Sequence, residues 1–477
     1  MFTQLRFQNF KSWQDTGDIR MAPLTGFFGP NSSGKTAILQ FLLMLKQTVE
    51  SSDRNRILHT GDAHTYVDLG TTYDLIHQHQ LPNQISFNLR WQPTPTNAEN
   101  LPLLPCRKQD TDEYSGVHLS QYRSALEFSC TIFLDLNNIT VNNLSYIYTD
   151  QNQQQNAIEM TRQNSNFYNL TLAGETIASL KPSFIERLSA PFKFYSFPVN
   201  FFKFSVVSTD GTLRFIPDEK PRFIQNDFLD ELVLSLENQL KDLYYLGPLR
   251  EYPRRIYNWS GEQLKGVGQY GESTIQALLT SRKDNSVVQE KVAYWLKELG
   301  LIHDFQLQPI AANRQEYELL VRRTPGSSKV SLKDVGFGVS QVLPVLVLCY
   351  YAPQGATIIF EQPEIHLHPS VQAGLADIFI DVIKTRNVQI IIESHSEHLL
   401  RRLQRRIAEE TQHFSNQDAA LYFCHVDQEG KSVLDSLQLD PYGNISNWPN
   451  GFFGDEMGDL VAMTEAAMQR QLLEQRS

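Results

Sequence analysis

Residues 29–36 of the chain, GPNSSGKT, have the types and spacing that bind a row of phosphates. They fit G-x-x-x-x-G-K-[ST] at every fixed position, between an apolar run that ends at Phe28 and a segment with helical spacing of apolar residues. Gly29 and Gly34 let the backbone turn tightly so that its N–H groups face a phosphate, and the helix N-terminus adds a partial positive charge. The alternative interpretation is a glycine-rich turn with a chance lysine.

We therefore predict a nucleotide-binding loop made of Gly29, Pro30, Asn31, Ser32, Ser33, Gly34, Lys35 and Thr36. Lys35 can reach the β and γ phosphates, and the Thr36 hydroxyl can bind Mg²⁺. Such loops occur in many enzymes, so the motif indicates a nucleoside triphosphate and leaves the base open. The sequence has no Asn-Lys-x-Asp or Thr-Lys-x-Asp motif for guanine, which favours ATP as the ligand.

A second motif, TIIFEQPE at residues 357–364, ends a short apolar run with the carboxylate of Glu361. We expect this run to be a strand that lies directly beside the strand preceding the nucleotide-binding loop. Glu361 would then lie near Mg²⁺ and reach it through a water molecule. The alternative is an acidic residue at a strand end that faces solvent.

The composition is that of a globular protein that is not built to bind nucleic acid broadly. The 477 residues are 41% hydrophobic and 20% charged, which allows roughly two or three domains. The formal charge of -11 gives no broad basic surface for phosphates. The basic candidates are RRLQRR at 401–406 and the pair Arg254 and Arg255, although such runs are usually solvated faces.

Targeting signals are not visible in the sequence. No apolar run approaches the ~20 residues that span a membrane, so we expect no membrane contact, and the first residues lack the plan of a signal peptide. The four cysteines lie far apart without a C-x-x-C pair, which favours reduced thiols and a cytoplasmic protein.

The order of predicted elements indicates an α/β fold with a split core. Apolar strands alternate with helices after residue 240, which is typical of a parallel sheet. Helices are expected at 228–243, at 287–300 and, fully buried, at 342–352. The middle of the chain is strand-rich, with strands predicted at 85–91, 126–136, 144–149 and 192–197 and polar loops at 94–114 and 151–156. We predict a head formed by 1–50 and 240–430, a β-rich antiparallel insertion at 52–220, and a small C-terminal module at 431–477.

The motifs together resemble a known superfamily. LRFQNFKS at 5–12, the nucleotide-binding loop, EQPEIHLHP at 361–369 and IIIESHS at 390–396 are similar to the ATP-binding-cassette (ABC) heads of RecF-type and SMC-type P-loop ATPases. They are particularly similar to the compact ATPases of bacterial anti-phage defence and of overcoming-lysogenization-defect-like systems. The resemblance covers about 1–50 and 240–450, and PYGNISNWPNGFF at 441–453 resembles a C-terminal module attached to one group of these ATPases.

This resemblance implies contacts with the γ-phosphate from two further places. SLKDVGFGVSQVLP at 331–344 occupies the position of the signature motif, which binds the nucleotide held by a second subunit, and implies contacts from Gly336, Gly338 and Ser340. The usual serine-glycine-glycine order is missing, and a plain loop-to-helix turn is the alternative. His395 matches the switch histidine that hydrogen-bonds the γ-phosphate, although a histidine at a strand end is more often structural.

Two histidines near Glu361 could suggest a metal site. His366 and His368 are spaced by two residues, but no cysteine or third histidine accompanies them. We therefore expect the loop that holds them to precede a helix beginning at Pro369, and to lie at a subunit contact.

Gln362 stands where the family usually has the glutamate that activates water. An amide cannot accept the proton, and loss of a general base costs about 10²- to 10⁴-fold in rate. Glutamine can still orient water, because phosphoryl transfer depends mostly on positioning and charge stabilisation. Two outcomes stay open: Glu364 supplies part of the base, or turnover is slow and the ATP-bound form is long-lived.

The resemblance implies an ATPase that forms a homodimer or higher homo-oligomer with ATP and Mg²⁺ between its heads. It also implies that the protein acts as a nucleotide-gated regulator or scaffold for a protein effector in anti-phage defence. The alternative is a DNA-repair or chromosome-binding ATPase of the SMC or RecF type. A nuclease in the same chain is not expected, because roughly 80 residues follow His395 without a cluster of acidic ligands. The terminal helix expected near 458–475 has a mild apolar stripe through Leu460, Met463, Ala467 and Leu472 that could contact a partner.

Overall fold

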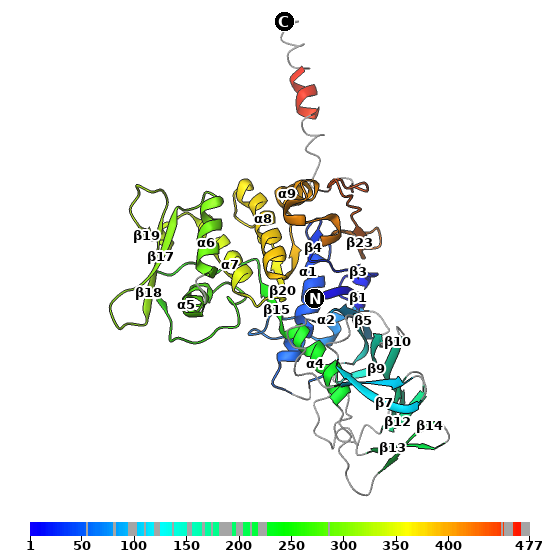
Figure 1. Cartoon of the computed structure of the whole chain (residues 1–477). Coiled ribbons are helices and arrows are strands. Elements are labelled where there is room, and N and C mark those ends of the chain that lie inside the picture. Colours follow the sequence, from blue (N-terminus) through cyan, green and yellow to red (C-terminus); the bar gives the residue numbers. More distant parts are fainter. Residues whose placement is uncertain are drawn as a thin grey trace.

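In the computed structural model, a parallel sheet at the centre of the molecule lies beside a large antiparallel sheet (Figure 1). The structure describes the whole chain except residues 54–55, 80–82, 94–102, 109–110, 119–124, 136–137, 150–154, 165–166, 173–174, 181–192, 197–203, 210–211, 218–226, 285–286, 450–451, 453–460 and 469–477.

The central sheet has six strands in the order β15-β20-β21-β4-β22-β23. Its strands are β4 (Leu24–Phe28), β15 (Leu243–Leu246), β20 (Thr357–Glu361), β21 (Gln389–Glu393), β22 (Ala419–Val426) and β23 (Ser432–Ser436). All neighbours are parallel except β23, which pairs antiparallel with β22. The prediction that β20 lies directly beside β4 is wrong, because β21 pairs with both strands and lies between them. β4, β20 and β21 are all almost entirely buried, so their order depends on the crossover helices and cannot be read from local sequence.

Each face of the parallel sheet covers its own hydrophobic core. Ile359 and Ile391 point toward the antiparallel sheet and helix α1 (Lys35–Glu50). Ile358 and Ile390, one residue earlier on the same strands, point into the second core, because side chains alternate along a strand. The second core contains α5 (Thr274–Asp284), α6 (Val287–Glu298), α7 (Phe337–Tyr351), α8 (Pro369–Arg386) and α9 (Glu397–Ala408).

Most helices predicted from apolar spacing are present. The predicted helix at 228–243 is α4 (Asp227–Lys241), and the one at 287–300 is α6, which ends just before Gly300 with its positive φ of 68°. The buried run at 342–352 forms most of α7. Pro369 begins α8 as expected, with His368 as the N-cap residue.

The antiparallel sheet has nine strands and joins the start of the chain to its middle. Its path is β12-β11-β10-β9-β8-β5-β1-β2, and β3 also pairs with β1. These strands are β1 (Phe2–Phe10), β2 (Trp13–Asp15), β3 (Ile19–Arg20), β5 (Gln84–Trp91), β8 (Leu126–Asp135), β9 (Asn138–Thr149), β10 (Gln155–Asn164), β11 (Phe167–Leu172) and β12 (Glu175–Leu180). The predicted alternation of β8 is confirmed, since its buried and less buried positions alternate along the whole strand.

Two predictions for the middle of the chain differ from the structure, and a third lies mostly outside the described residues. The expected loop at 94–114 contains a hairpin of β6 (Leu103–Lys108) and β7 (Thr111–His118), whose strands pair only with each other among the described residues. The expected strand at 192–197 contains a turn at 193–196 instead. The Lys193 ammonium there donates to the carbonyls of Thr48, Val49 and Ser51 at the end of α1, so this segment serves as a helix cap. The expected loop at 151–156 lies mostly outside the described residues, and its last two residues begin β10.

The remaining elements are short. They are α2 (Thr72–Leu75), the hairpin of β13 (Phe204–Thr209) and β14 (Thr212–Pro217), and a small sheet of β16 (Tyr257–Asn258), β17 (Asp304–Pro309), β18 (Glu316–Arg322) and β19 (Val330–Ser331). The small sheet lies with α5 and α6 on the side of the molecule away from the antiparallel sheet (Figure 1).

The segment that contains Gly443 and Phe452 packs on α9 and on the end of β4. The amide of Gln404 donates to the Gly443 carbonyl at 2.8 Å, and the Phe452 ring contacts the rings of Phe28, Phe423 and Trp448. Residues 461–468 form a helix whose side chains are all exposed and which projects away from the rest of the molecule (Figure 1). Within the predicted apolar stripe Met463 and Ala467 are therefore exposed, while Leu460 and Leu472 lie outside the described residues.

Three cysteines, Cys130, Cys349 and Cys424, are buried free thiols. In the described part of the chain, no helix combines the length and apolar character that crossing a bilayer requires.

Candidate nucleotide site

The glycine-rich loop joins β4 to α1 with backbone angles that require its glycines. Gly29 has a φ of 136° and Gly34 a φ of 92°. A Cβ atom on Gly29 would lie 2.1 Å from the Cys424 carbonyl oxygen, so no larger residue fits. Gly34 is the N-cap residue of α1 and has no side chain to cap the first turn. The first-turn N–H groups and the helix dipole can therefore act on an anion in the loop.

Lys35 lies inside this loop rather than in solvent. Its side chain is buried, and its ammonium donates to the carbonyls of Gly29 at 3.1 Å and Pro30 at 2.6 Å. Burial lowers the pKa of Lys35, and the Glu393 carboxylate opposes this shift. The ammonium is thus held at the point where the loop turns, where a phosphate would be bound.

The Thr36 hydroxyl faces an acid that the sequence analysis did not assign. It donates to the Glu393 carboxylate, with oxygen–oxygen distances of 3.0 and 2.9 Å. Glu393 is the last residue of β21 and is 2% exposed. Burial and the charge of Glu361 raise the pKa of Glu393 to about 7, against the opposing effect of the Thr36 hydrogen bond. The signal was present in the sequence, because IIIE ends an apolar run with an acid just as TIIFE does.

Glu361 lies next to Glu393 at the same edge of the sheet. The two residues are register partners on the paired strands β20 and β21. The Tyr245 phenol donates to the Glu361 carboxylate at 2.7 Å, and burial raises the pKa of Glu361. Strand pairing thus brings the predicted acid and the nucleotide-binding loop to one edge, with Glu393 between them.

The residues at this edge fit a bound Mg²⁺. Thr36, Glu361 and Glu393 supply only hydroxyl and carboxylate oxygens, which Mg²⁺ prefers. Burial and the neighbouring Glu361 carboxylate raise the pKa of Glu393, and a bound cation would relieve this unfavourable pairing of acids. No cluster of three or more histidine, cysteine or acidic side chains among the described residues could hold a metal alone. That is compatible with Mg²⁺ in nucleotide sites, which takes one or two protein carboxylates and binds phosphates and waters as well.

The segment after Glu361 is held in an unusual backbone conformation. Gln362 has a φ of 44°, and its N–H donates to the Glu393 carbonyl at 2.8 Å. A non-glycine residue in the left-handed region is uncommon and is found preferentially at functional sites. Gln362 is partly exposed, so its amide can meet a ligand or water.

Glu364 and His395 are joined to each other. Glu364 is 6% exposed, and its carboxylate accepts a hydrogen bond of 2.6 Å from the backbone N–H of His395. Burial lowers the pKa of the His395 imidazole, and the charge of Lys35 lowers it further. The imidazole is therefore close to the nucleotide-binding loop, and Glu364 positions the loop that carries it.

The segment at 331–344 contains the start of α7. Gly336 is the exposed N-cap residue, and Gly338 follows in the first turn. The Ser340 hydroxyl is buried and donates to the Phe337 carbonyl at 2.7 Å, so it is already engaged within the helix. The Phe337 ring contacts that of His366, with 5.3 Å between ring centroids. This segment therefore lies against the loop that follows β20.

Residues 1–400 match the AAA ATPase domain family. The chain belongs to this family. The predicted fold class is confirmed: the ATPase is an α/β P-loop NTPase head with a parallel core and a β-rich antiparallel sheet. Residues 415–463 match a second family, a protein of unknown function termed DUF3696, and no curated protein matches the chain.

Several solved structures are weakly similar to the ATPase. An SMC head bound to the C-winged helix domain of ScpA is 10% identical with a TM-score of 0.41, over 92% of this chain and 98% of that chain. The SMC head domain from Thermotoga maritima is 10% identical with a TM-score of 0.35, over 92% and 99%. An Smc head with an extended coiled coil, bound to the C-terminal domain of ScpA derived from Pyrococcus furiosus, is 11% identical with a TM-score of 0.38, over 92% and 96%.

The basic residues that could contact DNA are paired with acids in the ATPase. Arg402 and Arg406 both bind Asp377 of α8, Arg401 pairs with Glu397 of α9, and Arg405 pairs with Glu409, the C-cap residue of α9. In the remaining candidate pair, Arg254 binds Glu251 and Arg255 binds Asp334. Since each guanidinium already has a carboxylate partner, these residues do not form an unpaired basic track for phosphates.

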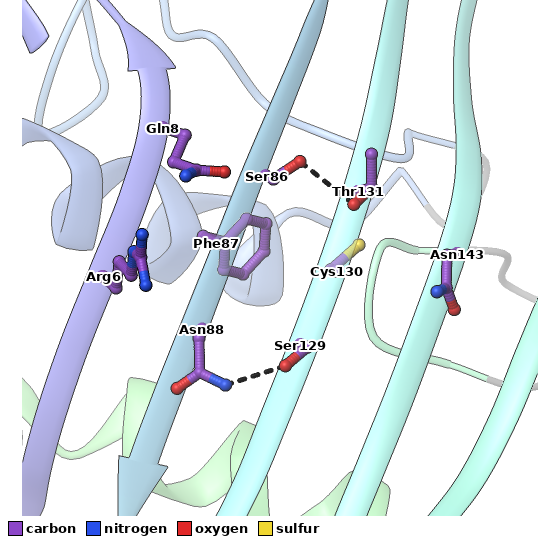
Figure 2. A pocket seen from close by; sticks show the side chains of 9 residues that line it. All are labelled: Arg6, Gln8, Ser86, Phe87, Asn88, Ser129, Cys130, Thr131 and Asn143. Atoms are coloured by element: carbon purple, nitrogen blue, oxygen red, sulfur yellow. Dashed lines mark hydrogen bonds between the residues drawn. The ribbon is translucent and has the colours of Figure 1, made fainter. Parts of the chain in front are cut away.

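A hollow of about 300 Å³ lies elsewhere in the ATPase, on the antiparallel sheet (Figure 2). Its polar side chains bond to one another, since Ser86 pairs with Thr131 at 3.1 Å and Asn88 donates to Ser129 at 2.8 Å. The guanidinium of Arg6 at its edge is paired with Asp15. Cross-strand bonds of this kind are expected on the polar face of a sheet, so we place the nucleotide site at the glycine-rich loop.

Proposed function

We propose that this ATPase binds ATP with Mg²⁺ at the glycine-rich loop and hydrolyses it slowly. The observation that carries the proposal is the meeting of Lys35 and Thr36 with the carboxylates of Glu393 and Glu361 at one edge of the parallel sheet. Thr36, Glu361 and Glu393 are the residues that would hold Mg²⁺. The bound ion would neutralise phosphate charge during transfer of the terminal phosphoryl group.

Slow turnover is supported by the groups available to activate water. Gln362 carries an amide where a general base is needed. The Glu364 carboxylate is buried and accepts a hydrogen bond from the backbone N–H of His395. Gln362 can orient a water molecule, and His395 can donate to the terminal phosphate. ATP then acts mainly to hold a closed state, and hydrolysis sets the lifetime of that state.

The closed state in this proposal is a homodimer with two ATP molecules between two heads. Gly336 and Gly338 lie at the accessible start of α7, where backbone N–H groups can meet a phosphate of the partner's nucleotide. The exposed helix at 461–468 offers a separate surface for an effector protein. The role in bacterial anti-phage defence comes from the resemblance of the motifs described above.

Substitution of Lys35 tests the nucleotide site. Isothermal titration calorimetry with ATP and Mg²⁺ is expected to show saturable binding to the wild type and none to Lys35→Ala. Lys297→Ala on the surface of α6 is the control, since Lys297 is exposed. Retention of ATP affinity in Lys35→Ala would remove the assignment of the loop.

Light scattering coupled to size exclusion tests the dimer. The non-hydrolysable analogue AMP-PNP with Mg²⁺ is expected to double the mass of the wild type and to leave Lys35→Ala unchanged. An unchanged wild-type mass in the presence of bound analogue would contradict the dimer while leaving nucleotide binding intact.

A further inference from the structure

Arg250 is a buried cation at the nucleotide edge that no motif in the sequence indicated. It lies four residues after the end of β15, the edge strand that pairs in parallel with β20. Leu246 of β15 is opposite Phe360 of β20, so the chain leaves β15 at the same edge of the sheet as Glu361. The Arg250 side chain turns inward and is 9% exposed.

The guanidinium of Arg250 has no hydrogen-bond partner among the described residues, at any of its three nitrogens. The groups that act on its charge are Tyr245, Glu361 and Glu364. A guanidinium has five N–H donors, and burying these donors away from water without hydrogen bonds costs free energy. Buried cations in proteins are normally paired and hydrogen-bonded, so this arrangement indicates a partner that the chain itself does not supply.

The loop that carries Arg250 is anchored on both sides. The Gly247 N–H donates to the Gln269 carbonyl, and the Glu251 N–H donates to the Tyr270 carbonyl, both at 2.8 Å. Further along, Arg255 forms a two-pronged ion pair with Asp334. The backbone that carries Arg250 is therefore fixed before any ligand binds, which lowers the entropy lost on binding.

A phosphate is the partner that this geometry favours. The planar guanidinium matches phosphate oxygens with two parallel hydrogen bonds, and arginine is widely used for that purpose. β20 and β21 separate β15 from β4. Arg250, which follows β15, and the glycine-rich loop, which follows β4, therefore lie on opposite sides of Glu361 and Glu393. It is thus placed to meet the far end of a phosphate chain whose near end is held by that loop.

We propose that Arg250 binds the terminal phosphate of the bound nucleoside triphosphate and lets the site distinguish ATP from ADP, an inference that rests on the proposed function. Lys35 and the loop amides hold the phosphates that both nucleotides share, and Arg250 adds contacts that only the triphosphate can make. Arg250 is therefore a residue that reports the state of the nucleotide to the loop between β15 and β16.

Calorimetric titration of AMP-PNP and ADP, each with Mg²⁺, tests this assignment. Arg250→Met keeps an apolar stem without charge, and Arg250→Lys keeps the charge without the planar fork. Arg250→Met is expected to weaken AMP-PNP binding about 10- to 100-fold, the range for hydrogen bonds to a charged group, and to change ADP binding less than about 3-fold. Arg250→Lys is expected to fall between Arg250→Met and the wild type for AMP-PNP. Arg254→Met, in the same loop but exposed, is the matched control.

The outcomes separate this inference from the proposed function. Unchanged affinities in Arg250→Met, or equal losses for AMP-PNP and ADP, would overturn the role of Arg250 while ATP binding by the wild type stands. A wild type that binds neither nucleotide would instead overturn the proposed function. If Arg250→Met does not fold, Arg250→Lys decides: a selective loss of AMP-PNP affinity supports the inference, and an unchanged ratio of the two affinities overturns it.

Discussion

The backbone N–H of His395 donates a hydrogen bond of 2.6 Å to the Glu364 carboxylate, which joins the loop after β20 to the loop after β21. Glu364 is buried, and burial raises the pKa of its carboxyl group. The chain therefore uses this carboxylate to hold the backbone at His395. This contact supports a positioning role for Glu364. Substitution of Glu364 can distinguish that role from a role as general base.

Glu364→Gln is expected to keep ATP turnover within about 3-fold of the wild type, because the amide oxygen can still accept from the His395 N–H. Removal of a general base would instead lower turnover by about 10²-fold or more. Steady-state phosphate release measures the difference. Glu364→Ala leaves the His395 N–H without an acceptor and should lower the free energy of unfolding by about 1–3 kcal/mol. A fall in Glu364→Gln turnover to that of a base deletion would contradict the positioning role.

Gln362→Glu is expected to raise ATP turnover by at least about 10-fold, because a general base contributes about 10²- to 10⁴-fold. The substitution is nearly isosteric and leaves the backbone requirement at a φ of 44° unchanged. Gln412→Glu is the control, since Gln412 is exposed and has a similar φ of 53°. Brisk turnover by the wild type that Gln362→Glu does not change would contradict slow hydrolysis.

Glu393→Gln is expected to stabilise the nucleotide-free protein at pH 8. The pKa of Glu393 is raised from its ordinary 4.5 to about 7, so the folded state holds this proton more tightly than the unfolded chain does. The group therefore lowers the free energy of unfolding as pH rises from about 4.5 to 7, by up to about 3 kcal/mol. Denaturant unfolding of both proteins at pH 5 and pH 8 measures the difference, which should be small at pH 5.

The same variant should bind ATP with a weaker dependence on Mg²⁺, because one candidate oxygen ligand has lost its charge. Glu298→Gln, an exposed residue at the end of α6, serves as the control for both measurements. A wild type and a Glu393→Gln variant with equal stability at both pH values would show that Glu393 carries no raised pKa.

Phe452→Ala is expected to lower the free energy of unfolding by about 3 kcal/mol, the lower end of the cost of a large-to-small substitution in a core. The ring packs on Phe28, the last residue before the glycine-rich loop, and on Phe423 and Trp448. Tyr442→Ala is the comparison, since Tyr442 is 78% exposed in the same C-terminal region. Equal unfolding midpoints for the two variants would mean that the C-terminal segment adds no stability to the head.

The glycine-rich loop could be predicted from sequence because its requirements are local. Gly29 must turn with a positive φ, Gly34 must precede a helix, and Lys35 follows at a set distance, all within eight residues. The alternation of β8 and the helical spacing of apolar residues in α4 are local in the same sense, because each repeats within one element. The strand at the other end of the site, β20, was likewise visible as an apolar run with an acidic end.

Which groups meet at the site was decided only by the tertiary structure. The pairing of β21 between β4 and β20 brings Glu393 to Thr36, and the parallel register of β15 brings Arg250 to the same edge. Strand order is set by crossovers between segments hundreds of residues apart, so neither neighbour can be read from the adjacent sequence. The pKa of Glu393 follows from burial and from a second carboxylate, and both exist only after the chain has folded.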